Sequence, residues 1–272
     1  MKGRAVVLFS GGSDCTLAAA KAAQSGRFEE IILLTYEVPV SCLDANAGRN
    51  VPRLRTAFPG VRFTHAMMPA GPVIEKILAK KRLRSLVRHG LMEASLCLHC
   101  RMGMHVRTVM YCLDNDVAHV LDGSNVTMAL WVDQTRKGLE MIDQLYRAFG
   151  ITLEHPVVDY VGDDLFDLVK YLSPEELDGV IHKSTSQELH EMNVLGDGGH
   201  KSDYATSYRA QPVCLGVVMS LIHSLGYRLP FEPYPQFQRR ALAWLRDKVE
   251  ISTEMLTEYR NERRGSELGR LI

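Results

Sequence analysis

Apolar runs of strand length alternate with longer amphipathic stretches through the first 160 residues. The apolar runs lie at residues 5–9, 30–38, 61–68, 117–121 and 152–158. Patterns of helical period lie between them at 17–23, 45–57, 73–89 and 133–149. Pro52 predicts a kink in the second of these helices. This alternation predicts an α/β fold in which helices cover both faces of a doubly wound, mostly parallel five-stranded sheet.

The pattern changes after about residue 160, and no further strand is predicted. Short helices are expected over 164–171 and 174–181, an apolar helix over 211–225, and one or two terminal helices over 235–264 with a solvated charged tail. The polar stretch from 183 to 209 predicts a long loop. We therefore expect an α/β domain over 1–160 and a mainly helical region over 161–272.

The first apolar run ends in Ser10-Gly11-Gly12-Ser13-Asp14-Cys15-Thr16, directly before a helical pattern. A glycine pair at a strand-to-helix turn lets the backbone approach a ligand closely. Unpaired amides at the helix start and the helix dipole favour an anion there, so the turn predicts a phosphate site. The segment is neither a Walker A loop, which needs a Lys-Ser or Lys-Thr pair, nor the dinucleotide G-x-G-x-x-G motif. The plain alternative is an ordinary capped glycine turn.

Composition and charge narrow the class of protein. Hydrophobic residues make up 46% and charged residues 24% of the chain, and no apolar stretch is long enough to cross a bilayer. The N-terminus runs directly into a strand, and the six cysteines form no secretory pattern, so we expect a cytoplasmic protein without a membrane partner. Residues 1–150 carry 19 Lys and Arg against 13 Asp and Glu, which favours a phosphate-bearing ligand in this half.

Cys97 and Cys100 form a C-x-x-C pair, which can place two thiolates on one metal centre. The pair suits half of a zinc site, a redox dithiol or part of an iron–sulfur site. The chain has no second such pair, so a zinc site would need His99, His105 or Cys214. With Cys214, three thiolates can hold three irons of a 4Fe-4S cluster. The fourth iron is then open to a sulfide that acts as a nucleophile.

The glycine turn resembles the PP-loop, S-G-G-x-D-S, of the ATP pyrophosphatase superfamily. Enzymes of this superfamily cleave ATP to AMP and pyrophosphate while they adenylate an oxygen atom. Cys15 stands where the family usually has serine, and a thiol is the weaker donor. Either the Thr16 hydroxyl or the helix amides alone are expected to replace the missing serine.

The cysteines extend this resemblance. The order of the PP-loop, Cys97, Cys100-Arg101 and the distant Cys214 is similar to that of PP-loop enzymes that thiolate tRNA with a 4Fe-4S cluster. The turn 122–125, Asp-Gly-Ser-Asn, is similar to the nucleotide-contacting turn of PP-loop enzymes that insert sulfur into small pyridinium substrates. The likeness covers residues 4–125, and beyond them only Cys214 supports it.

The resemblance implies a fold like that of the adenine nucleotide alpha hydrolases and a set of site residues. ATP with Mg2+ would be bound by Ser10, Gly11, Gly12, Asp14, Cys15, Thr16, Tyr36, Gly123 and Ser124. The catalytic residues would be Asp14, Cys97, Cys100 and Cys214, and the three cysteines among them would hold the 4Fe-4S cluster.

The function implied is that of an ATP-dependent sulfur transferase. It would adenylate a carbonyl oxygen of a nucleobase-like heterocycle and replace that oxygen with sulfur from the cluster. The substrate would be a small free heterocycle, which the acidic second half favours, or a tRNA base. Sulfide or a cysteine desulfurase would be the sulfur donor, and the sequence leaves a homodimer open. One alternative is a PP-loop ligase that uses ammonia, like the deazaguanine nitrile synthases, with zinc on the cysteine pair. Another is an adenine-nucleotide sensor, which the glycine turn disfavours.

Other residues could bind RNA or a metal ion, but each also suits an ordinary structural role. The basic segment 80–89 suits contact with tRNA phosphates or the solvated face of an amphipathic helix. His182, His190 and His200 suggest a metal site, but their spacing matches no usual ligand pattern. Cys112 is expected in the core and Cys42 in a loop.

Overall fold

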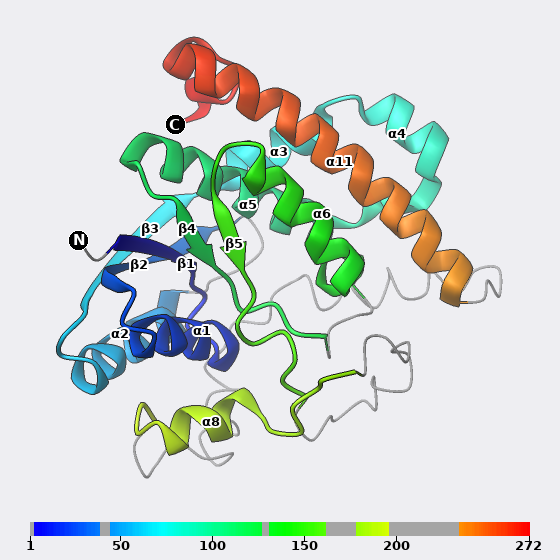
Figure 1. Ribbon diagram of the computed structural model, residues 1–272. Helices are drawn as coiled ribbons and strands as arrows, with labels where there is room; N and C mark the ends of the chain where they lie inside the picture. The colour runs from blue at the N-terminus through cyan, green and yellow to red at the C-terminus, as the bar shows by residue number, and fades with distance from the viewer. Residues whose placement is uncertain (1–2, 39–43, 127–130, 162–177, 196–233) are drawn as a thin grey trace.

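The five apolar runs form one sheet in the computed structural model, which describes residues 3–38, 44–126, 131–161, 178–195 and 234–272 (Figure 1). The strands are β1 (Gly3–Leu8), β2 (Phe28–Glu37), β3 (Arg62–Pro69), β4 (His119–Leu121) and β5 (Thr152–Glu154). They lie in the order β3-β2-β1-β4-β5, and every neighbouring pair is parallel. The strand order reverses at β1, so the carboxyl ends of β1 and β4 flank the position where such sheets bind ligands.

Helices cover both faces of this sheet (Figure 1). One face carries α1 (Ser13–Gln24), α2 (Asp44–Ala57) and α8 (Thr185–Glu191); the other carries α3 (Gly71–Ala79), α5 (Leu96–Asn115), α6 (Arg136–Arg147) and α11 (Tyr234–Glu262). Alternate residues of β1 serve the two faces, because side chains of a strand point in opposite directions in turn. Val6 packs in the core with α5 and α11, whereas Ala5 and Val7 pack with α1. The predicted doubly wound α/β fold is confirmed.

The helix predicted over 73–89 is interrupted. α3 ends at Ala79, Lys81 adopts a left-handed conformation with φ 55°, and α4 (Arg82–His89) then begins in a new direction. This break lets the lysines of the junction reach the C-terminal segment: Lys81 Nζ lies 2.7 Å from Glu254 Oε2. The basic segment is therefore not one amphipathic helix.

α8 lies inside the stretch that the sequence predicts as a loop. Ser184 caps the helix, since its side chain accepts a hydrogen bond from the Gln187 amide. A serine followed three residues later by glutamine is a known start signal for a helix. Of the helix predicted over 174–181, the described residues 178–181 are not helical, and Ile181 forms a parallel bridge with Tyr160. The helices predicted over 164–171 and 211–225 lie outside the described residues.

α11 is a single helix that matches the terminal helices predicted over 235–264. It shares one hydrophobic core with α5 and α6. The charged residues at the end of this segment, Glu262, Arg263 and Arg264, are exposed as predicted, whereas Ser266 and Leu268 after them are fully buried. The domain boundary near residue 160 stays a prediction. None of the described helices is long and apolar enough to cross a membrane.

Candidate functional site

The glycine turn joins the carboxyl end of β1 to the first residue of α1. Gly11 has φ +79°, a left-handed conformation that glycine adopts without steric cost. Gly12 is the N-cap of α1, and no side chain caps the helix there. The first amides of α1 are therefore left for a ligand, as a phosphate site requires.

Cys15 and Thr16 turn their side chains back onto this turn. The Thr16 hydroxyl donates to the Gly12 carbonyl oxygen at 2.7 Å, and the Cys15 thiol donates to the same oxygen at 3.3 Å. Both side chains are buried, and burial raises the pKa of the Cys15 thiol. The expectation that either side chain donates to a phosphate stays a prediction. In this structure both donors are engaged within the turn, so the helix amides are the donors that remain.

Two residues that sequence reasoning missed hold the glycine turn in place. Asn50 of α2 donates from its side-chain amide to the Gly11 carbonyl oxygen at 2.6 Å. Thr185 of α8 donates to the Asp14 carboxylate at 2.5 Å. Burial raises the pKa of Asp14, and the hydrogen bonds from Thr185 and Ser13 oppose that shift. No local pattern marks Asn50 or Thr185, because each lies far along the chain from its partner.

The turn after β4 touches the glycine turn directly. A Cβ atom on Gly123 would lie 2.6 Å from the Cys15 backbone nitrogen, so only glycine allows this close approach. The carboxylate of Asp122 accepts hydrogen bonds from the Ser124 amide at 3.1 Å and from the Ser124 hydroxyl at 2.6 Å. The side-chain amide of Asn125 donates to the Tyr160 carbonyl oxygen at 2.6 Å. The two predicted nucleotide-binding turns therefore lie against each other at the carboxyl edge of the sheet.

Cys97 and Cys100 lie in the first turn of α5, three residues apart and so on one face of the helix. Both side chains are partly exposed, and they are not joined in a disulfide. Leu98 and His99, between them, are buried. The two thiols are therefore partly accessible, while the residues between them anchor the first turn of α5 in the core.

The histidines that could complete a zinc site have other partners. His99 Nδ1 donates to the Ser95 carbonyl oxygen at 2.8 Å, and its Nε2 lies 3.3 Å from Glu93. His105 Nδ1 lies 2.9 Å from the Tyr146 hydroxyl, and burial lowers the pKa of His105 to about 3. Over the described ranges, no group of three or more His, Cys, Asp and Glu side chains is arranged to hold a metal ion.

The other predicted site residues lie outside the described residues or show no sign of a metal-binding role. Cys214, Cys42 and His200 lie outside the described residues, so the three-cysteine ligand set stays a prediction. His182 is exposed, and His190 Nδ1 lies 3.2 Å from the Leu195 carbonyl oxygen.

Two predicted residues are packed in the core. The side chain of Tyr36, a predicted ATP-binding residue, is buried on the α5 face, and its hydroxyl lies 2.5 Å from the Thr108 hydroxyl. Burial raises the pKa of Tyr36. Cys112 is buried as predicted. The side chain of Tyr36 therefore packs, and only its backbone at the end of β2 is near the ligand edge.

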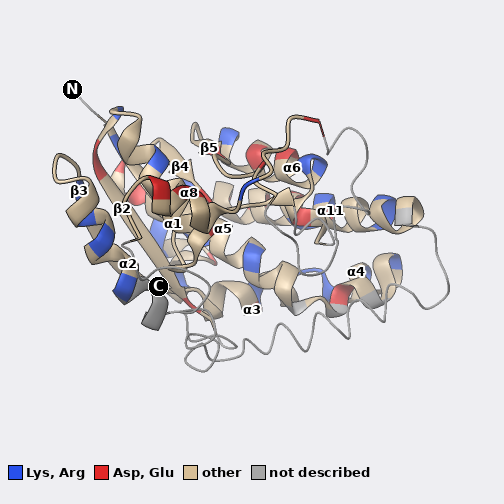
Figure 2. Ribbon diagram, turned by 90° about the horizontal axis from the view of Figure 1, so that it is seen from below, with Lys and Arg blue, Asp and Glu red and all other residues tan. Residues whose placement is uncertain are grey.

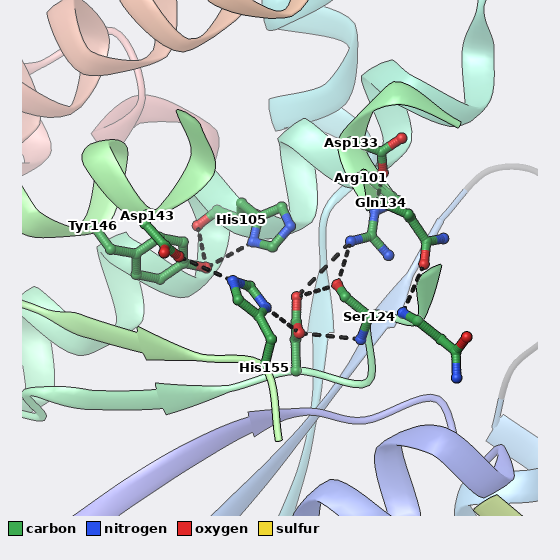
Figure 3. A network of polar contacts seen from close by, with 10 residues as sticks. Arg101, His105, Ser124, Asp133, Gln134, Asp143, Tyr146 and His155 are labelled. Carbon is green, nitrogen blue, oxygen red and sulfur yellow. Dashed lines mark hydrogen bonds and ion pairs between the residues drawn. The ribbon is translucent and has the colours of Figure 1, made fainter. Parts of the chain in front are cut away.

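Arg101 connects the cysteine helix to the nucleotide turn (Figure 3). It follows Cys100 directly, and its Nη2 donates to the Ser124 hydroxyl oxygen at 3.0 Å and lies 3.8 Å from the Asp122 carboxylate. Its Nε pairs with the buried carboxylate of Asp133. Two carboxylates thus orient the guanidinium beside the predicted nucleotide turn.

His155, at the end of β5, is a further site residue that sequence reasoning missed (Figure 3). Its Nδ1 lies 2.7 Å from Asp122 and its Nε2 lies 2.9 Å from Asp143. Burial alone would lower the pKa of His155, but the two carboxylates outweigh it and raise that pKa to about 10. Burial alone would raise the pKa of Asp122, whereas His155 and Arg101 lower it. The one available signal for His155 was its place inside the fifth apolar run, where a polar side chain interrupts the apolar pattern.

The C-terminal part of the chain neutralises part of the basic segment 80–89, and no ion pair of Arg82 or Arg84 is found among the described residues. Lys80 Nζ lies 2.5 Å from Glu267, and Arg88 Nη1 lies 2.8 Å from Asp247. His89 Nε2 also lies 2.8 Å from Asp247. These contacts make the segment an interface with α11 and the residues after it.

No protein-family model matches this chain, and no curated protein matches it. Solved structures are similar to it in fold. One is NMN synthetase from Francisella tularensis, with 16% identity and a TM-score of 0.37, over 72% of this chain and 77% of that chain. Another is the U34-tRNA thiolase NcsA from Methanococcus maripaludis with its 4Fe-4S cluster. It has 12% identity and a TM-score of 0.39, over 92% of this chain and 73% of that chain. Both likenesses are remote and concern the fold alone.

Proposed function

We propose that this protein is an ATP-dependent sulfur transferase of the PP-loop type. ATP binds at the glycine turn with Mg2+, and a carbonyl oxygen of a nucleobase-like heterocycle attacks the α-phosphorus, so that pyrophosphate leaves. Sulfur then adds to the adenylated carbon, and the original oxygen departs with AMP. The products are a thiocarbonyl compound, AMP and pyrophosphate.

One observation carries this proposal: Arg101 links the helix that bears Cys97 and Cys100 to the turn after β4, and that turn lies against the glycine turn. Gly123 lies on the backbone of Cys15, Ser124 accepts a hydrogen bond from Arg101, and Arg101 follows Cys100 directly. Adenylation and sulfur delivery act on the same carbon, so the groups that perform them must be neighbours. A chain whose glycine turn and cysteine pair had unrelated roles would have no need of this arrangement.

The chain's own residues have distinct parts in the reaction. The uncapped first turn of α1 binds phosphate oxygens through its amides. The Asp14 carboxylate is the kind of hard oxygen ligand that Mg2+ prefers. Arg101, oriented by Asp133 and Asp122, holds a fixed positive charge beside the nucleotide turn. A preorganised cation there stabilises the negative charge that develops as pyrophosphate leaves.

The cysteine pair fits an iron–sulfur site by its donor chemistry. Cys97 and Cys100 supply two soft thiolates from one helix face, and Cys214 would supply the third. When bound, a 4Fe-4S cluster supplies a sulfur nucleophile at the iron that lacks a protein ligand. The partners of His99 and His105 disfavour a zinc site completed by either histidine.

We propose a small heterocycle rather than a tRNA base as the substrate. Lys80, Lys81 and Arg88 are paired with carboxylates of α11 and the segment after it. Paired cations attract a nucleic-acid backbone less strongly than unpaired ones, since binding depends on cations that neutralise phosphates. The basic segment therefore offers weak support for an RNA partner.

Anaerobic purification, followed by iron and zinc analysis and an absorption spectrum, tests the cofactor. We expect iron, inorganic sulfide and the broad visible absorption of an iron–sulfur cluster. Cys97→Ala, Cys100→Ala and Cys214→Ala should each lose the iron. Cys112→Ala is the matched control and should keep it, because Cys112 is buried and burial raises the pKa of its thiol to about 12.

The reconstituted protein is then incubated with ATP, Mg2+, sulfide and a panel of free heterocycles and unmodified tRNA, and pyrophosphate is measured. Zinc without iron would overturn sulfur transfer and favour the ammonia-using ligase. Iron retained by Cys214→Ala would remove that residue from the ligand set. Pyrophosphate released only with tRNA would overturn the choice of a small substrate.

A further inference from the structure

α8 lies against the glycine turn although it is about 170 residues away in the chain. Both views place it beside α1, and the two helices are in contact (Figures 1 and 2). Its first residue, Thr185, is buried. The Thr185 hydroxyl donates to Asp14 Oδ1 at 2.5 Å and lies 3.0 Å from Ser13 Oγ. A threonine from a distant segment is thus built into the start of α1.

The position of α8 does not depend on this hydrogen bond. Leu189, in the middle of the helix, is fully buried in the same core as α1. Val194 and Leu195, directly after the helix, join that core too. At the other end, Ser184 caps the helix through the Gln187 amide. The packing of α8 therefore holds Thr185 next to Asp14, where its hydroxyl donates a hydrogen bond to the carboxylate.

Thr185 is the main partner of the Asp14 carboxylate. Ser13 Oγ lies 3.4 Å from Asp14 Oδ1, which is long for a hydrogen bond between a hydroxyl and a carboxylate. Within the described ranges, no lysine, arginine or histidine forms an ion pair with Asp14. The short hydrogen bond from the buried Thr185 side chain consequently fixes the orientation of the Asp14 carboxylate.

We propose that Thr185 is a positioning residue of the nucleotide site, which fixes the Asp14 carboxylate toward the metal-bound phosphates of ATP. This inference rests on the proposed function, because it takes the glycine turn to bind ATP with Mg2+. It extends that function by adding α8 as a third element of the site, beside the glycine turn and the turn after β4. Without the Thr185 hydroxyl, the carboxylate must be ordered at the moment of binding, which costs affinity.

The test compares Thr185→Val, which keeps the shape and removes the hydroxyl, with Thr185→Ser, which keeps the hydroxyl. Calorimetric titration with ATP and Mg2+ should show about tenfold weaker binding for Thr185→Val, as for a lost hydrogen bond to a charged group. Thr185→Ser should bind within about twofold of the unmodified protein. Ser184→Ala is the matched control: it should lower the melting temperature of the protein through the lost helix cap and leave ATP affinity unchanged.

A double-mutant cycle shows whether Thr185 acts through Asp14. In an Asp14→Asn background, Thr185→Val should cause no further loss of ATP affinity. Thr185→Val that binds ATP as tightly as the unmodified protein would overturn the inference while the proposed function stands. Equal losses in Ser184→Ala and Thr185→Val would also overturn it, since the fold of α8 and not the hydroxyl would then matter. An unmodified protein that does not bind ATP would overturn the proposed function itself, and with it this role.

Discussion

His155 lies between two carboxylates at the carboxyl edge of the sheet, and they raise its pKa to about 10, which favours the protonated imidazole at neutral pH. Asp122 also accepts a hydrogen bond from Ser124, and Ser124 accepts one from Arg101. A connected set of polar contacts therefore supports the turn that we assign to the nucleotide. Buried charges of this kind are stable only as a set, because removing one leaves its partner uncompensated. The protonation of His155 therefore affects the stability of the whole protein.

We expect the contribution of His155 to depend on pH in a definite direction. Its pKa rises from 6.5 to about 10 on folding, so the contribution is complete below pH 6.5 and is lost as the pH approaches 10. Over that window the free energy of unfolding should fall by up to about 1.4 kcal/mol per pH unit. Urea denaturation at several pH values measures this slope.

His155→Gln should lose about 3–5 kcal/mol at pH 6 and should lack this part of the slope. His119→Gln is the control, because the His119 side chain is 41% exposed and lies 4.0 Å from its acidic neighbour. Curves for the unmodified protein and His155→Gln that run parallel from pH 6.5 to 10 would contradict the assignment.

At the scale of elements, a buried ion pair joins the start of the cysteine helix to α11. Glu93, in the turn before α5, lies 2.6 Å from Lys248 Nζ, and both residues are buried. Trp244 of α11 and Ser85 of α4 donate to the same carboxylate. Burial alone would raise the pKa of Glu93, but these partners and His99 lower it to about 2. One carboxylate thus connects three helices.

Lys248→Met should destabilise the protein by about 3–5 kcal/mol, because the buried Glu93 carboxylate would lose its cation. Lys81→Met breaks an ion pair with the same helix, but Lys81 and Glu254 are exposed, so it should cost less than about 1 kcal/mol. Urea unfolding of both variants measures the difference. Similar small losses in the two variants would show that Glu93 does not depend on Lys248.

At the scale of the whole molecule, the chain closes by packing its C-terminal residues onto the helix layer above the sheet. Leu268 is fully buried in the core that contains α5, α6 and α11. Glu267 beside it pairs with Lys76 and Lys80 at the α3 end of the layer. Ser266, Leu268 and Gly269 are therefore buried, while Arg270 and Ile272 after them are exposed.

Leu268→Ala should lower the free energy of unfolding by about 2–5 kcal/mol, the usual cost of a cavity in a core. Ile272→Ala removes a side chain that is 48% exposed and should change it by less than about 0.5 kcal/mol. Thermal and urea unfolding distinguish the two variants. A Leu268→Ala protein as stable as the Ile272→Ala protein would show that Leu268 does not contribute to the core.

The strands, their parallel arrangement and the position of the glycine turn could be predicted because each has a local signature. Buried parallel strands appear as short apolar runs, and a Gly-Gly pair between a strand and a helix marks a close approach of the backbone. The break between α3 and α4 could not be predicted in this way. The lysines at the break contact carboxylates more than 170 residues further on, in and after α11, and no local pattern marks such contacts.

The sequence by itself determined the α/β class, the place of the glycine turn and the presence of a cysteine pair, since these depend on neighbours along the chain. Only the tertiary structure decided that Arg101 joins the cysteines to Ser124, and that Asn50, His155 and Thr185 support the same edge. Such contacts form when the carboxyl ends of separate strands and distant helices meet, and hydrogen bonds between distant segments leave no periodic trace in the residues that make them.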